Sequence, residues 1–151
     1  MKSAYTLEIL INSTLESIKH IIPYSFSAKP LLSSPSLIAQ QVHIDILGDF
    51  KGTLIINENG EVFSKLGESM FGMLLEGEML QSFMGEFGNM VAGQLATIVS
   101  QKGLNMDITP PLVAQMDGYP NKTHYCTVPV ELENGGELHF SFFLNELAEA
   151  N

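Results

Sequence analysis

The apolar positions near the start of the chain recur at close to the helical repeat. Over residues 5–22 large apolar side chains fall on one side, while Asn12, Glu16 and Lys19 fall on the other. This pattern predicts an amphipathic helix, and Pro23 ends it. Residues 23–36 hold three prolines and five serines, which predicts an extended connection.

Alternating apolar and polar positions predict strands in two regions. Residues 38–47 place Val42, Ile44 and Ile46 on one face and polar residues on the other, which is typical of a half-buried strand. The turn at 48–52 and the run at 53–57 complete a hairpin. Three further strands are predicted at 107–116, 123–132 and 137–144, and the turn at 133–136 joins the last two.

Two helices are predicted between these regions. Residues 61–77 have helical spacing, with a kink expected near Gly72, and a long helix follows over about 78–102, with Gly103 as its stop. The order is therefore helix, two strands, two helices and three strands. This order predicts one α+β domain over residues 1–151, with a mainly antiparallel sheet and helices packed on one face.

The composition narrows the classes of function. The chain is 45% hydrophobic and 16% charged, an ordinary globular balance, and its net charge is −10 without any Arg. That charge argues against nucleic-acid partners and against an anionic membrane surface. A membrane span needs about 20 apolar residues, and no run in the sequence is that long. The N-terminus does not resemble a signal peptide. We therefore expect a cytoplasmic protein.

The sequence gives little support for a cysteine-based active site or a metal site. Cys126 is the single cysteine, and the chain has no Arg, which a tyrosine-phosphatase-like cysteine site needs. We therefore expect Cys126 to be an ordinary strand residue. The four histidines lack metal-ligand spacing, which predicts no metal site, and we expect His43 and His139 on an exposed sheet face. Five methionines are expected to form pliable core. These are Met70, Met73, Met79, Met84 and Met90.

The long helix carries three glycines, although each costs about 1 kcal/mol relative to Ala in a helix interior. At 100° per residue, its buried face comprises Leu80, Phe83, Met84, Phe87, Val91, Gln94, Leu95 and Ile98. The opposite face comprises Ser82, Gly85, Glu86, Asn89, Gly93, Ala96 and Ser100. Glu86 and Asn89 are thus surface neighbours among small residues. Such a face could admit a partner's backbone, or it could serve packing between this protein's own helices.

The stretch MGEFGNMVAG at 84–93 resembles the E-x-x-N signature of the CheC/CheX/FliY family of chemotaxis phosphatases, with Glu86 and Asn89 at the motif positions. The resemblance extends to the order of elements along nearly the whole chain. CheC-type members usually carry two such helices. The single motif found here therefore resembles the CheX branch.

The resemblance implies a phosphatase acting on the phospho-aspartate of a CheY-type response regulator. Asn89 would orient the attacking water, and Glu86 would dock onto a receiver Lys. Ser82, Gly85 and Gly93 would contact the partner. The receiver would supply Mg²⁺, so no cofactor of the chain's own is expected, and members are typically homodimers. The alternative is a non-catalytic binding or adaptor module of the same fold.

Overall fold

An antiparallel sheet of seven strands organises the protein, which is described here from a computed structural model. The structure describes residues 2–23, 25–30, 40–115, 124–133 and 135–145. The helices are α1 (Lys2–Lys19), α2 (Val62–Phe71) and α3 (Gly77–Gln101). The strands are β1 (Phe26–Ala28), β2 (Gln40–Gly48), β3 (Gly52–Asn59), β4 (Met106–Ile108), β5 (Leu112–Gln115), β6 (His124–Leu132) and β7 (Glu137–Leu144).

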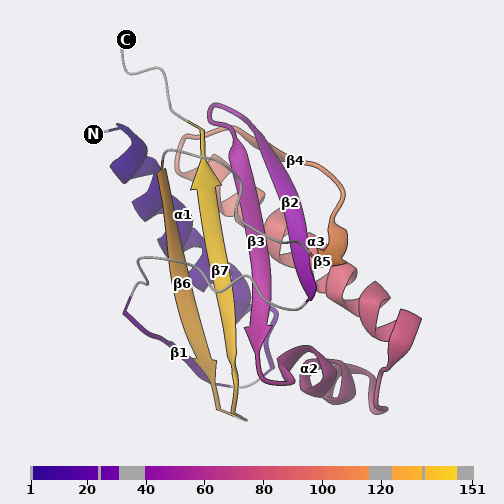
Figure 1. The fold of residues 1–151 in the computed structure, drawn as a ribbon. Helices are drawn as coiled ribbons and strands as arrows, with labels where there is room; N and C mark the ends of the chain where they lie inside the picture. The colour runs from indigo at the N-terminus through magenta and orange to yellow at the C-terminus, as the bar shows by residue number, and fades with distance from the viewer. Residues whose placement is uncertain (1, 24, 31–39, 116–123, 134, 146–151) are drawn as a thin grey trace.

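The strand order is β1-β6-β7-β3-β2-β4, and β5 pairs with β2 beside β4. Helices α1 and α3 lie together behind the sheet, while α2 lies near one end of β3 (Figure 1). Every strand pairing is antiparallel. This arrangement confirms the predicted α+β class, because the helices that cover the sheet gather on one of its faces.

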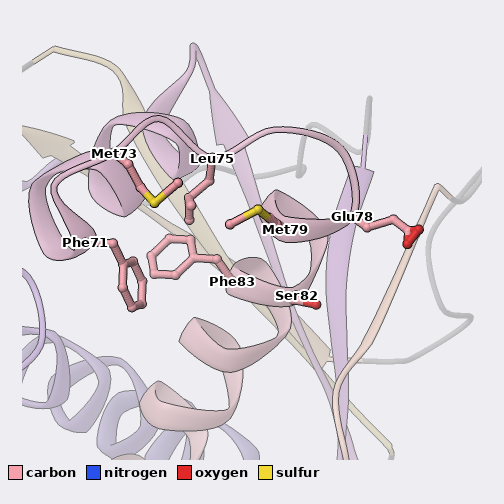
Figure 2. A pocket seen from close by; sticks show the side chains of 7 residues that line it. All are labelled: Phe71, Met73, Leu75, Glu78, Met79, Ser82 and Phe83. Carbon is pink, nitrogen blue, oxygen red and sulfur yellow. The ribbon is translucent and has the colours of Figure 1, made fainter.

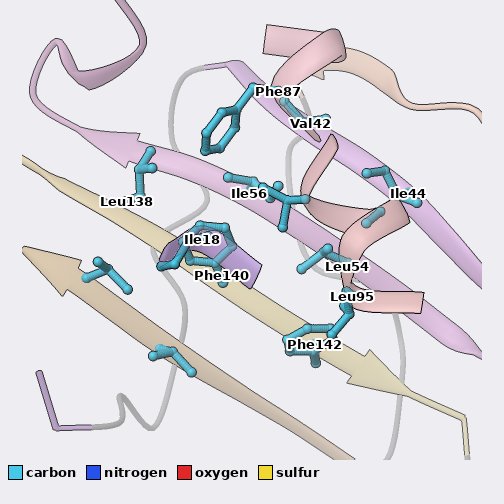
Figure 3. Close-up of a cluster of buried hydrophobic side chains, with 14 of the residues drawn as sticks. Ile18, Val42, Ile44, Leu54, Ile56, Phe87, Leu95, Leu138, Phe140 and Phe142 are labelled. Atoms are coloured by element: carbon cyan, nitrogen blue, oxygen red, sulfur yellow. The ribbon is translucent and has the colours of Figure 1, made fainter. Parts of the chain in front are cut away.

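The core lies between the sheet and these helices. The alternation that predicted β2 puts Val42 and Ile44 into it, beside Phe87 and Leu95 of α3 (Figure 3). Strands β3 and β7 complete the centre of the cluster, because their pairing brings the apolar residues that face the helices side by side. These residues are Leu54, Ile56, Leu138, Phe140 and Phe142.

The face of the sheet turned away from the helices is mostly polar, and many of its residues are buried, although Asp45, Leu47 and Tyr125 are exposed. Thr127 and Ser141 share a hydrogen bond of 2.7 Å there, and His43 lies 2.8 Å from the Gln41 side chain. The prediction of exposed histidines is wrong. His139 is only 6% exposed, and its Nε2 lies 2.9 Å from the Glu137 carboxylate. His43 is half-buried, so that desolvation lowers the pKa of its imidazole.

Three predicted elements differ from the structure. The connection after α1 contains β1, a short strand paired with β6. The strand expected at 107–116 is two strands, β4 and β5, separated by Thr109–Pro111. The helix expected over 61–77 ends at Phe71, because Gly72 adopts a left-handed conformation (φ 73°) and its N–H donates to the Glu68 carbonyl.

The early end of α2 also changes the environment of the methionines. Met73 and Met79 are 52% and 54% exposed, and Met70 and Met90 are also on the surface. Of the five, Met84 is in the core. The prediction of a methionine core is therefore wrong for Met70, Met73, Met79 and Met90.

Among the described residues, no helix is both long and apolar enough to span a membrane.

Candidate functional site

Helix α3 is held on two sides by the protein's own elements. Its apolar stripe, from Phe83 to Val99, is buried against the sheet and α1. On the α1 side, the Ser17 hydroxyl donates a hydrogen bond of 3.2 Å to the Val91 carbonyl. The predicted buried face is confirmed at its centre, with Leu80 and Gln94 half-buried at its margins. The opposite face is therefore turned away from the core.

Gly88 explains one of the three helix glycines by internal packing. A Cβ at this position would lie 2.6 Å from Cγ1 of Val42 and 3.3 Å from Cδ1 of Ile44. Those distances are shorter than a side chain tolerates without displacement of β2. Gly88 therefore permits a close approach of α3 to the sheet, which is packing against a strand and not against another helix.

Glu86 and Asn89 are both accessible, and they lie in an open groove of about 710 Å³ between α3 and the segment from β4 to β5. The helix wall consists of Gln81, Ser82, Gly85, Glu86 and Asn89. Neither Glu86 nor Asn89 makes a side-chain hydrogen bond or ion pair within the described part of the chain. The structure thus places both motif residues in one accessible, concave site.

The opposite wall of the groove was not anticipated from the sequence. It consists of Ile108, Thr109, Pro110, Pro111 and Val113. Two hydrogen bonds fasten this wall to β2: the Asp45 N–H donates to the Thr109 hydroxyl, and the Thr109 N–H donates to the Asp45 carbonyl, each over 3.0 Å. The double proline was visible in the sequence, but nothing local indicated that it faces α3.

The other predicted partner-contacting residues occupy different positions. Ser82 and Gly85 line the groove, and a Cβ on Gly85 would be 3.6 Å from Cγ2 of Val113, an ordinary contact. Gly93 lies outside the groove, one turn beyond Asn89, and a Cβ added to it would have no neighbouring atom within 4 Å. The surface of α3 is therefore open at Gly93, whereas Gly85 forms part of the groove.

The chemistry available in the groove is that of one carboxylate and one carboxamide. A carboxamide can donate and accept hydrogen bonds, so it can hold a water molecule in a chosen orientation. A carboxylate can receive a Lys ammonium or another cation. No group of three or more His, Cys, Asp or Glu that could hold a metal ion occurs among the residues placed by the structure.

Residues 41–131 match the family described as chemotaxis phosphatase CheX. The chain belongs to the CheX family. The CheY-P phosphatase CheX of Thermotoga maritima is 31% identical over 120 residues, which cover 73% of this chain and 75% of that protein. Family membership agrees with the resemblance inferred from the motif and the order of elements.

Solved structures of CheX proteins and of a FliM middle domain share the fold. The CheX of Borrelia burgdorferi, crystallised in a complex with CheY, BeF₃ and Mg²⁺, superimposes with a TM-score of 0.77 at 18% identity, covering 93% of this chain and 97% of that one. A CheX from Desulfovibrio desulfuricans gives 0.74 at 17% identity, covering 96% and 100%. The FliM middle domain from H. pylori gives 0.61 at 8% identity, covering 91% and 86%.

Proposed function

We propose that this CheX-family protein hydrolyses the phospho-aspartate of a CheY-type receiver domain, with Asn89 orienting the attacking water and Glu86 docking onto the receiver. One observation carries the proposal: Glu86 and Asn89 are accessible on one face of α3, inside a groove, and neither side chain is paired with another of the described residues. The name of the Thermotoga maritima relative and the CheY complex of the Borrelia burgdorferi protein support the choice of substrate.

The reaction requires little covalent chemistry from this chain. Water attacks the phosphorus in line, the bond between phosphorus and the aspartate oxygen breaks, and inorganic phosphate and a free carboxylate result. The water's proton passes to the phosphate product. Positioning and charge stabilisation supply most of the rate in such transfers. The receiver's own Mg²⁺ and Lys would neutralise the phosphoryl charge.

Asn89 would supply what the receiver lacks, which is a group that holds the water. Its amide oxygen accepts a hydrogen bond from the water, while its NH₂ can donate to a phosphoryl oxygen. Because α3 is packed against both α1 and the sheet, the amide is carried on a rigid element. Glu86, three residues earlier on the same face, would pair with the receiver Lys and set the register of docking.

The test is phosphate release from Mg²⁺-bound receiver domains charged with acetyl phosphate, with and without the protein. Asn89→Ala should lower the turnover number roughly 10²-fold, the scale for loss of one positioning group, with little change in KM. Asn12→Ala is the matched control, because Asn12 is an exposed Asn on the surface of α1.

An Asn89→Ala enzyme with the wild-type turnover number would remove Asn89 from the mechanism. Binding of a receiver without any accelerated phosphate release would favour the adaptor alternative instead. The same preparations can test the predicted homodimer by sedimentation equilibrium, since the association of two copies is a separate proposal from the reaction.

A further inference from the structure

A second concavity lies beside the groove, where α2 ends and α3 begins. It has a volume of about 330 Å³, and its lining is almost entirely apolar. Its lining residues are Phe71, Met73, Leu75, Glu78, Met79, Ser82 and Phe83. Figure 2 shows the apolar ones gathered between the two helices and their connection, while the Glu78 carboxylate points away from them. We call this the α2–α3 pocket.

The α2–α3 pocket has fixed walls. The rings of Phe71 and Phe83 meet edge to face at 5.8 Å, a favourable aromatic geometry. Leu75 is only 4% exposed, and it packs so closely over Gly67 that a Cβ there would lie 2.6 Å from its Cδ1. The connection between the helices is therefore anchored, and it holds the other apolar side chains at the surface.

These surface side chains are costly to leave in water. Phe71, Met73, Leu74 and Met79 are each between 52% and 60% exposed and lie within nine residues of sequence. Phe71, Met73 and Met79 line the same pocket, and a contiguous exposed apolar surface marks interaction sites. Methionine is suited to such a site because its flexible thioether adapts to a partner's shape.

The pocket adjoins the groove that holds Glu86 and Asn89. Ser82 lines both concavities, and about 15 Å of helix separates Met79 from Asn89. That span fits within one partner's footprint in an interface of standard size. One protein docked on the exposed face of α3 can therefore cover both concavities at once.

The charged residues in the segment that forms the pocket are all acidic. Between Lys65 and Lys102 the sequence contains four Glu residues and no Lys, Arg or His. Two of them, Glu76 and Glu78, are exposed at the start of α3, and Glu78 lines the pocket. A partner that complements this pocket would present an apolar side chain with a basic residue beside it.

We propose that the α2–α3 pocket anchors the receiver domain, by taking an apolar side chain that is flanked by Lys or Arg near the receiver's phosphorylation site. This inference rests on the proposed function, and it assigns to the same partner a second contact. The pocket governs recognition, whereas Asn89 governs the chemical step. Removal of the anchor should therefore raise KM and leave the turnover number in place.

The variants Met79→Ser and Met73→Ser remove apolar surface from the pocket without emptying the core, since both side chains are half-exposed. Each should raise KM for a charged receiver roughly tenfold, which corresponds to about 1.4 kcal/mol. Tyr5→Ser is the matched control: Tyr5 is 59% exposed near the start of α1, which lies at the other end of the molecule from α2 (Figure 1). Thermal unfolding of each variant checks that it is folded.

Two charge-reversal variants test whether a basic residue of the receiver lies beside the pocket. Glu78→Lys should raise KM by several-fold, whereas Glu8→Lys, the same change in net charge on the exposed surface of α1, should not. An unchanged KM in both folded methionine variants, with an active wild type, overturns the anchor and leaves the proposed function standing. A wild type that accelerates no receiver overturns both. If Met79→Ser instead shifts sedimentation from dimer to monomer with KM unchanged, the occupant is a second copy and the proposal is wrong.

Discussion

Gly88 of α3 and Val42 of β2 are in such close contact that a Cβ on residue 88 would lie 2.6 Å from the valine Cγ1. This contact sets the depth at which α3 rests on the sheet. It also turns Glu86 and Asn89, which lie on either side of Gly88 in sequence, away from the core. A glycine that looks unfavourable in a helix thus helps to place the candidate site.

The contact predicts opposite effects for two glycine substitutions. Gly88→Ala should lower the free energy of unfolding by about 1 kcal/mol or more, because overpacking outweighs the gain in helix propensity. Gly93→Ala should raise it by about 0.5–1 kcal/mol, because nothing lies within 4 Å of the new methyl group. Urea unfolding measures both, and equal midpoints would contradict the packing argument.

Gly93→Ala also tests the predicted contact of that position with a partner. If the partner's backbone lies over Gly93, the variant should be more stable and yet have a higher KM for the charged receiver. A stabilised protein with the wild-type KM would place Gly93 outside the interface.

Gly85 predicts a dependence of docking on the size of its side chain. Gly85→Ala makes ordinary contacts with Val113 and Pro111, at 3.6 and 3.9 Å, so the groove should remain open. Gly85→Leu should fill the space between α3 and that wall and raise KM roughly tenfold or more, as expected when an added side chain blocks a docking surface. Phosphate-release kinetics distinguish the two, and a Leu variant with the wild-type KM would exclude the groove as the docking site.

Glu86 predicts a dependence on charge and salt. Glu86→Gln should weaken docking modestly, and Glu86→Lys should raise KM roughly tenfold, because an attraction to the receiver Lys becomes a repulsion. Added salt should raise the wild-type KM by screening, and this dependence should weaken in Glu86→Lys. Glu8→Lys on α1 is the control for net charge. Receiver affinity that is unchanged in Glu86→Lys would show that Glu86 has no part in docking.

Cys126 predicts a slow thiol reaction and a loss of stability in alkali. Burial on β6 raises the pKa of its thiol to about 11, so the folded state favours the protonated form. At pH 8 its reaction with a disulfide reagent should be about 100-fold or more slower than that of a free cysteine. Stability is fully present below the unfolded pKa near 9 and declines as pH rises toward 11. Cys126→Ala should lack the part of this loss of stability that comes from the thiol. Rapid labelling of Cys126 in the native wild type would contradict its burial.

Local pattern by itself determined much of the fold and the direction of the motif. Alternation placed Val42 and Ile44 in the core, and the 100° helical step placed Glu86 and Asn89 on a common outer face. These features depend on neighbours within a few residues, so the sequence contains them directly. The E-x-x-N spacing and the order of elements then indicated the family.

Other features were decided by contacts between distant parts of the chain. The wall opposite Asn89 exists because Thr109 binds Asp45, 64 residues earlier, and no local pattern encodes that pairing. His139 is only 6% exposed although it lies on the sheet face turned away from the helices, and the alternation along β7 does not encode that burial. The α2–α3 pocket depends on the left-handed turn at Gly72 together with the packing of Leu75 over Gly67. Periodicity assigns a residue to a face of its own element, but tertiary packing alone decides what that face meets.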